Sequence, residues 1–179
     1  MLKSLANLLG KKNNDDNSEN ASNTNIPKVV SIDIQNKNPH EENLYAKQKK
    51  LKNDFSRSKN DVAVDAINKG NIDNAIKLYK EAIELNTESS ISLYNLGNAY
   101  FEEGDLEQAI EYYRKSIEND PKNHLSHYNL GLCLYRMDLL QEAIEHYQKA
   151  IEIFPNDATV YYNLAKAYEK SKELVKAIE

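Results

Sequence analysis

A pattern of 34 residues recurs through the second half of the sequence. L-Y-N-L-G at 93–97 is followed 34 residues later by H-Y-N-L-G at 127–131, and then by Y-Y-N-L-A at 161–165. A-I-E-Y-Y at 109–113 is followed at the same interval by A-I-E-H-Y at 143–147. A fixed period of this length is typical of stacked supersecondary units, each of which is too small to bury its own apolar face. The period therefore predicts an array of short units.

The pattern resembles the tetratricopeptide repeat, a family in which two antiparallel helices form each repeat, with a small residue midway along each helix and a proline at the end. The matching residues of the copy that begins at Ser90 are Leu93, Leu96, Gly97, Tyr100, Ala109, Tyr113 and Pro121. Those of the next copy are Leu130, Gly131, Leu134, Ala143, Tyr147, Ala150 and Pro155. The predicted fold class is therefore all-α: a right-handed α-solenoid of helix-turn-helix repeats, preceded by a largely disordered leader.

Individual residues of the repeats have expected structural roles. Gly97 and Ala109 lack bulk where the paired helices must approach closely, and large side chains such as Tyr113 should fill the remaining core. Gly104 is expected to make the turn between helices. Asp138 stands at the corresponding place of the next copy and tolerates left-handed backbone geometry better than most residues.

The leader before the repeats is polar apart from its first ten residues and the β-branched stretch 26–34, which is interpreted as part of the linker or as a linear docking motif. Leu2, Leu5, Leu8 and Leu9 share one helical face, which is interpreted either as a short amphipathic anchor for a membrane surface or partner groove, or as a frayed terminus. Residues 11–25 include too few apolar residues to offset the cost of ordering their backbone. The predicted organisation is an amphipathic helix over 1–10, a disordered linker over 11–40, a helical lead-in over 41–55, and an array over 56–179 with repeats 56–89, 90–123, 124–157 and an incomplete 158–179.

A helix without Gly or Pro is predicted between Asn38-Pro39 and Lys69. Apolar residues recur along it at intervals of seven and four, which favours one long helix or two abutting ones. These residues are Leu44, Leu51, Phe55, Val62 and Ala66. The basic stretch 47–52 is interpreted as a solvated face or a contact for an acidic partner.

Charge and cysteine content limit the classes of function. Residues 61–179 carry 12 Lys and Arg against 21 Asp and Glu, which argues against a nucleic-acid surface on the repeats. Cys133 is the single cysteine, which favours a reducing compartment, and the first residues lack a secretory pattern. A cytoplasmic location is expected, with contact between residues 1–12 and a membrane surface left open.

Catalytic motifs are absent from the sequence, so no enzyme activity and no cofactor are expected. One candidate metal site consists of His124, His127, Cys133 and His146. His127 falls where repeats pack together and Cys133 lies within a helix, so these residues are interpreted as structural and no metal is expected.

The resemblance also implies a binding surface, since the first helices of tetratricopeptide repeats line a concave groove that holds extended peptides. A tyrosine and an asparagine recur at adjacent groove positions in each copy. The asparagine amide can form hydrogen bonds with a peptide backbone, and the tyrosine ring adds contact area. The same pair of residues is equally interpreted as stabilising contacts between helices. The groove positions are Tyr94, Asn95, Asn98, Phe101, Tyr128, Asn129, Leu132, Tyr135, Tyr162, Asn163 and Lys166.

Chaperone-binding members of the family clamp a carboxylate with two asparagines and three cations. Asn98 and Asn129 match the two asparagines, but Tyr94, Thr159 and Asn163 occupy the cationic positions, so this clamp is not expected.

The favoured hypothesis is a non-enzymatic adaptor that binds a peptide segment of a partner. Two alternatives stay open: the repeat arm of a larger enzyme, such as a peptide-modifying glycosyltransferase, and a membrane-peripheral assembly factor. Apolar residues near the C-terminal end also suggest self-association there.

Overall fold

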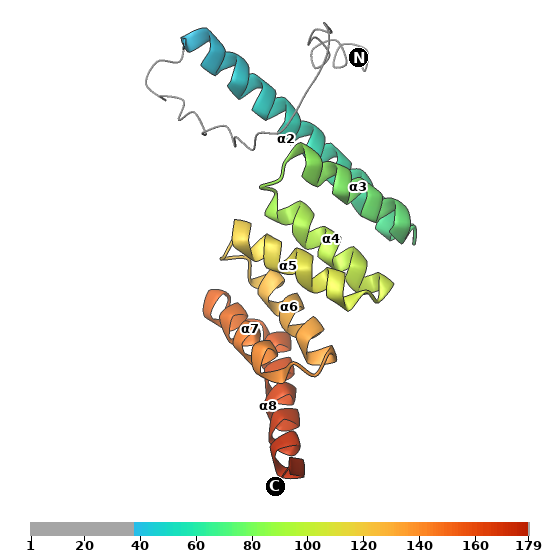
Figure 1. Cartoon of the computed structure of the whole chain (residues 1–179), viewed down its shortest axis with the longest axis vertical. Helices are drawn as coiled ribbons and strands as arrows, with labels where there is room; N and C mark the ends of the chain where they lie inside the picture. Colours follow the sequence, from blue (N-terminus) through green and yellow to red (C-terminus); the bar gives the residue numbers. More distant parts are fainter. Residues whose placement is uncertain (1–37, 179) are drawn as a thin grey trace, which may run out of the picture. The chain divides into compact units, whose positions relative to one another are not determined.

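The computed structural model describes residues 38–178, with side chains as far as Lys172 (Figure 1). The expectations for residues 1–37 lie outside this range. Every element between residues 38 and 178 is an α-helix. The helices are α2 (Pro39–Asn68), α3 (Ile72–Leu85), α4 (Ser90–Glu103), α5 (Leu106–Asn119), α6 (His124–Arg136), α7 (Leu140–Ile153) and α8 (Ala158–Ile178).

Consecutive helices pack in pairs. α2 packs on α3, α4 on α5 and α6 on α7, and the second helix of each pair also packs on the first helix of the next. The predicted all-α solenoid of two-helix repeats is confirmed by this arrangement. α2 runs without a break from Pro39 to Asn68, so the one-helix alternative is correct for this segment.

Short polar residues fix the helix ends. Asn71, Asp105 and Asn123 each precede a helix and accept a hydrogen bond from a backbone N–H in its first turn, at 3.0–3.2 Å. Such caps typically stabilise a helix by about 1 kcal/mol. Gly104 and Asp138 make the turns after α4 and α6 with positive φ, of 91° and 62°. The expectation of left-handed geometry at Asp138 is therefore confirmed.

Small residues allow the two helices of a repeat to meet. A Cβ atom added to Gly97 would lie 2.7 Å from the ring of Tyr113, and one added to Gly131 would lie 2.8 Å from the ring of Tyr147. Both tyrosine side chains are fully buried in the common core. The close approach predicted for Gly97 is therefore confirmed, because a tyrosine ring fills the space that a side chain would need.

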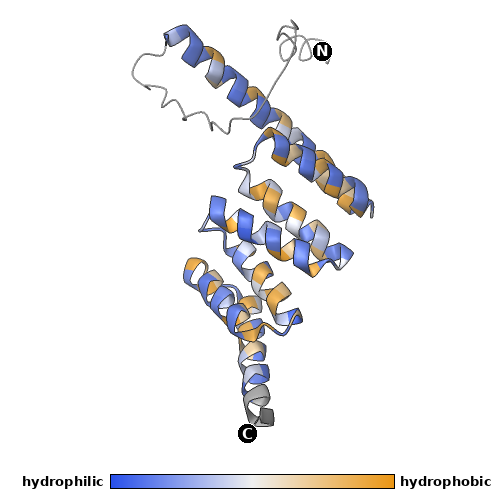
Figure 2. Cartoon of the chain, viewed as in Figure 1, coloured by the Kyte–Doolittle hydropathy of each residue, from blue (hydrophilic) through white to orange (hydrophobic). Residues whose placement is uncertain are grey.

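The first repeat departs from this pattern. Lys59 stands where the next repeat has the buried Leu93, and its Nζ lies 2.5 Å from a carboxylate oxygen of Glu81 on α3. The N-terminal half of α2 is solvent-exposed, and apolar residues occur along it (Figure 2). No helix within the described residues is both long enough and apolar enough to cross a membrane.

Candidate functional site

The predicted groove positions lie on the first helices of successive repeats. We call this surface the first-helix face; it comprises the groove positions on α4, α6 and α8 named above. α4 contacts α6, and α6 contacts α8, so the three helices lie side by side along one surface. Tyr162 and Lys166 are exposed, and the other groove positions are half-buried. The face is therefore accessible along its length.

Hydrogen bonds join this face from one repeat to the next. Asn129 donates through Nδ2 to the hydroxyl of Tyr94 at 3.3 Å, and Asn163 donates in the same way to Tyr128 at 3.1 Å. Asn95 donates to Oδ1 of Asn60 on α2 at 3.1 Å. Each of these contacts joins residues 35 apart. We call this set the tyrosine–asparagine ladder.

The ladder is tied to the buried core through Asn98. Its Oδ1 accepts one hydrogen bond from Nδ2 of Asn129 at 2.9 Å and another from the hydroxyl of Tyr113 at 2.6 Å. Asn98 thereby connects a core tyrosine of its own repeat with the first helix of the next. The interpretation of these amides as contacts between helices thus has direct geometric support.

Hydrogen-bonding capacity remains on the ladder. Within residues 38–172, the described bonds of Asn95, Asn129 and Asn163 use the Nδ2 donors and leave the Oδ1 acceptors without a partner. An amide oxygen of this kind can accept a hydrogen bond from a peptide N–H. One asparagine can thus join two helices and still contact a ligand.

A second set of contacts pairs cations with aromatic rings. The guanidinium of Arg136 lies 4.2 Å from the ring centroid of Phe101, and Nζ of Lys170 lies 5.0 Å from that of Tyr135. Lys166 lies 5.9 Å from the Tyr135 ring. Arg136 and Lys170 were not among the predicted residues. They follow their aromatic partners by 35 residues, the interval found in the ladder, but only the structure shows that side chains at this interval meet.

Lys170 is also held by the turn after α6. Its ammonium forms an ion pair with Asp138, the residue with left-handed backbone geometry. The hydrogen bond to this carboxylate raises the pKa of Lys170. The cation therefore remains charged at neutral pH at this end of the first-helix face.

A hollow of about 560 Å³ opens beside α4 and α6. Ile67, Ile72 and Phe101 supply apolar wall, and Asn98 and Asn129 bring amide groups to it. Ile67 and Ile72 belong to the first repeat and were not predicted, because that repeat deviates most from the pattern. The combination of apolar wall and a few polar groups is typical of a ligand-binding surface.

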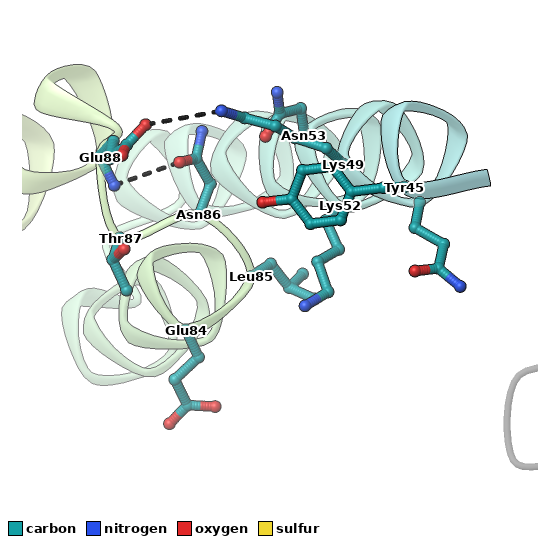
Figure 3. A pocket seen from close by; sticks show the side chains of 10 residues that line it. Tyr45, Lys49, Lys52, Asn53, Glu84, Leu85, Asn86, Thr87 and Glu88 are labelled. Atoms are coloured by element: carbon teal, nitrogen blue, oxygen red, sulfur yellow. Dashed lines mark hydrogen bonds and ion pairs between the residues drawn. The ribbon is translucent and has the colours of Figure 1, made fainter. Parts of the chain in front are cut away.

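Another hollow, of about 310 Å³, lies between the N-terminal part of α2 and the end of α3 (Figure 3). Lys49 and Glu88 approach within 4.0 Å across it, and the backbone N–H of Glu88 donates to Oδ1 of Asn86. Its charged groups are largely exposed and well solvated, so their ion pair contributes little energy.

The residues considered for a metal site are only partly brought together. Nδ1 of His127 lies 3.0 Å from Nδ1 of His146, whereas the ring of His124 packs against Phe154. Cys133 is fully buried, and burial raises the pKa of its thiol to about 12. The described residues contain no group of three potential metal ligands. The two facing histidines thus form a hydrogen-bonded pair between α6 and α7.

Comparisons with known proteins agree with this architecture. A family model described as anaphase-promoting complex, cyclosome, subunit 3 matches residues 68–150, and a model described as a TPR repeat matches residues 140–172. No curated protein matches the chain significantly. The matches to both family models fall within the helical array.

Solved tetratricopeptide repeat (TPR) structures superimpose well. The first TPR of Spaghetti (RPAP3), bound to the HSP90 peptide SRMEEVD, has a TM-score of 0.66 at 17% identity, covering 67% of this chain and 95% of that one. The Sgt2 TPR domain from Aspergillus fumigatus has a TM-score of 0.65 at 27% identity, covering 69% and 83%. MamA has a TM-score of 0.64 at 26% identity, covering 74% and 75%.

Proposed function

This chain belongs to the tetratricopeptide repeat family, and we propose that it is a non-enzymatic interaction scaffold that binds a peptide segment of a partner protein on the first-helix face. The observation that carries the proposal is the ladder, in which Asn129 and Asn163 keep an acceptor oxygen at equivalent places of successive repeats. A peptide that runs along the face meets the same acceptor once per repeat.

The chemistry of the face favours a segment with both apolar and polar side chains. The hollow beside Phe101 offers an apolar surface to one side chain of the peptide. Arg136 and Lys166 add positive charge near the aromatic rings, which suits acidic or polar groups of a ligand. Rigid aromatic side chains contribute contact area at low entropic cost.

A comparison with the peptide-bound neighbour limits the kind of segment. The first TPR of Spaghetti was solved with the HSP90 peptide SRMEEVD, and its 17% identity to this chain supports a common fold alone. In this chain Tyr94, Thr159 and Asn163 stand where a carboxylate clamp requires cations. We therefore propose an internal peptide segment rather than a free C-terminus.

Selection from a library of random peptides on the full chain tests the proposal, with affinities measured by fluorescence anisotropy. The test variant is Tyr162→Ala with Lys166→Ala, because both side chains are exposed on the face. The matched control is Leu125→Ala, since Leu125 is exposed on α6 and is not a groove position. We expect the selected peptides to bind the test variant about tenfold more weakly and the control unchanged. Peptides that bind both variants like the original chain would contradict the proposal.

A further inference from the structure

Four apolar side chains form an exposed line along α2. Leu44, Leu51, Phe55 and Val62 have exposed fractions of 44–51%, and we call them the α2 stripe. Their intervals of seven, four and seven residues place them within about 40° of one another around the helix axis. The stripe is about 27 Å long at the rise of an α-helix. Intervals of seven and four are those of residues that line the contact between two paired helices.

The stripe faces away from α4 and lies to one side of the face that packs on α3. α2 buries Ser56, Ala63 and Ala66, and Asn60 reaches α4 through its contact with Asn95. The stripe is centred about 160° around the helix from Asn60. The described helices therefore leave this side of α2 open to a partner.

The repeat register identifies this side as one that normally receives a helix. Val62 corresponds to Leu96 and Leu130 in the next two repeats, and both leucines are 0% exposed, whereas Val62 is 51% exposed. α4 packs extensively on α3 and α5, and α6 on α5 and α7, whereas among the described helices only α3 packs extensively on α2. The exposure of Val62 thus follows from the absence of a preceding helix within the described residues.

We propose that the α2 stripe is covered by the α2 stripe of a second copy of this chain, in an antiparallel pair. The spacing of the stripe is symmetric about the level of Asn53. A two-fold axis at that level therefore places Leu44 opposite Val62 of the other copy, and Leu51 opposite Phe55. All four side chains are then paired with apolar partners on both copies, as an isologous contact requires.

The charges beside the stripe favour the antiparallel orientation. Lys47 and Asp61 lie on the same flank of the stripe, in opposite halves of α2, and neither takes part in a described ion pair. In the antiparallel pair, Lys47 of each copy lies about two residues, or about 3 Å along the axis, from the level of Asp61 of the other. In a parallel pair this flank of one copy lies beside the opposite flank of the other, so Lys47 and Asp61 would not meet. The Lys47–Asp61 contacts thus favour the antiparallel orientation, which the apolar spacing also allows.

Measurement of the mass of the full chain by sedimentation equilibrium tests this inference. We expect a dimer that becomes a monomer in the variant Leu51→Glu with Phe55→Glu, while circular dichroism shows unchanged helix content, because both positions are exposed. The variant Leu125→Glu introduces one glutamate at a position of similar exposure and should remain a dimer. A full chain that is monomeric would overturn the proposal.

A charge exchange tests the orientation. Lys47→Glu alone and Asp61→Lys alone should each weaken dimerisation by about threefold to tenfold, since each creates two like-charge contacts in the dimer. The double variant should recover the original affinity.

A dimer that is insensitive both to these changes and to the glutamates at 51 and 55 would place self-association elsewhere, such as at the C-terminal end, and would overturn the proposal. A monomer that dimerises only after Leu5→Asp with Leu8→Asp would identify the leader as the occupant and would also overturn it.

Discussion

The hydroxyl of Tyr113 donates a 2.6 Å hydrogen bond to Oδ1 of Asn98, although the tyrosine ring is fully buried against Gly97. The next repeat keeps the tyrosine, as Tyr147, but has Leu132 at the position of Asn98. Within the described residues the hydroxyl of Tyr147 is buried without a hydrogen-bond partner. Two repeats with the same pattern thus differ in whether a core hydroxyl is satisfied.

Removal of these two hydroxyls should have different effects on stability. Tyr113→Phe takes a donor from Asn98 and should lower the free energy of unfolding by about 1 kcal/mol. Tyr147→Phe removes an unsatisfied polar group and should leave the free energy of unfolding unchanged or raise it by up to about 1 kcal/mol. Urea unfolding of both variants measures the difference. Equal losses would show that the Tyr147 hydroxyl has a hydrogen-bond partner in solution.

The ladder asparagines should contribute to stability as well as to binding. Asn129→Ala removes hydrogen bonds to Tyr94 and Asn98, and we expect the free energy of unfolding to fall by about 1–2 kcal/mol. Asn156→Ala, at an exposed position between α7 and α8, serves as the control and should change it by less than about 0.5 kcal/mol. An unchanged midpoint in urea for Asn129→Ala would mean that the ladder does not join the helices in solution. Binding assays of ladder variants therefore need a parallel measurement of stability.

The contacts within a repeat could be predicted from the sequence, whereas those between repeats could not. The close approach at Gly97 follows from its place in the pattern, because a small residue recurs opposite a large one in each copy. The contact between Arg136 and Phe101 depends on how far one repeat is displaced along the next, which no single repeat encodes. The unsatisfied hydroxyl of Tyr147 depends on a single departure from the pattern, at Leu132. The resemblance between repeats depends on the residues that match, so it does not reveal the effect of one residue that differs.

The paired histidines of α6 and α7 should make stability depend on pH. Nε2 of His127 lies 3.3 Å from the carbonyl oxygen of Pro121, so its N–H donates there and Nδ1 is left to accept from Nδ1–H of His146, 3.0 Å away. Burial lowers the pKa of both imidazoles below the ordinary value for histidine. The neighbouring charge of Arg114 further lowers that of His146, and Glu142 opposes it.

A lowered pKa means that the unfolded chain binds protons more tightly than the folded one. The contribution of the pair is therefore fully present above the pKa of an unfolded histidine, about 6.5, and is lost as pH falls below that value. We expect the free energy of unfolding, measured in urea, to be lower at pH 5.5 than at pH 7.5. The variant His127→Gln with His146→Gln should depend less on pH over this interval, because no imidazole remains at the contact. The same slope in this variant as in the original chain would show that other groups cause the pH dependence.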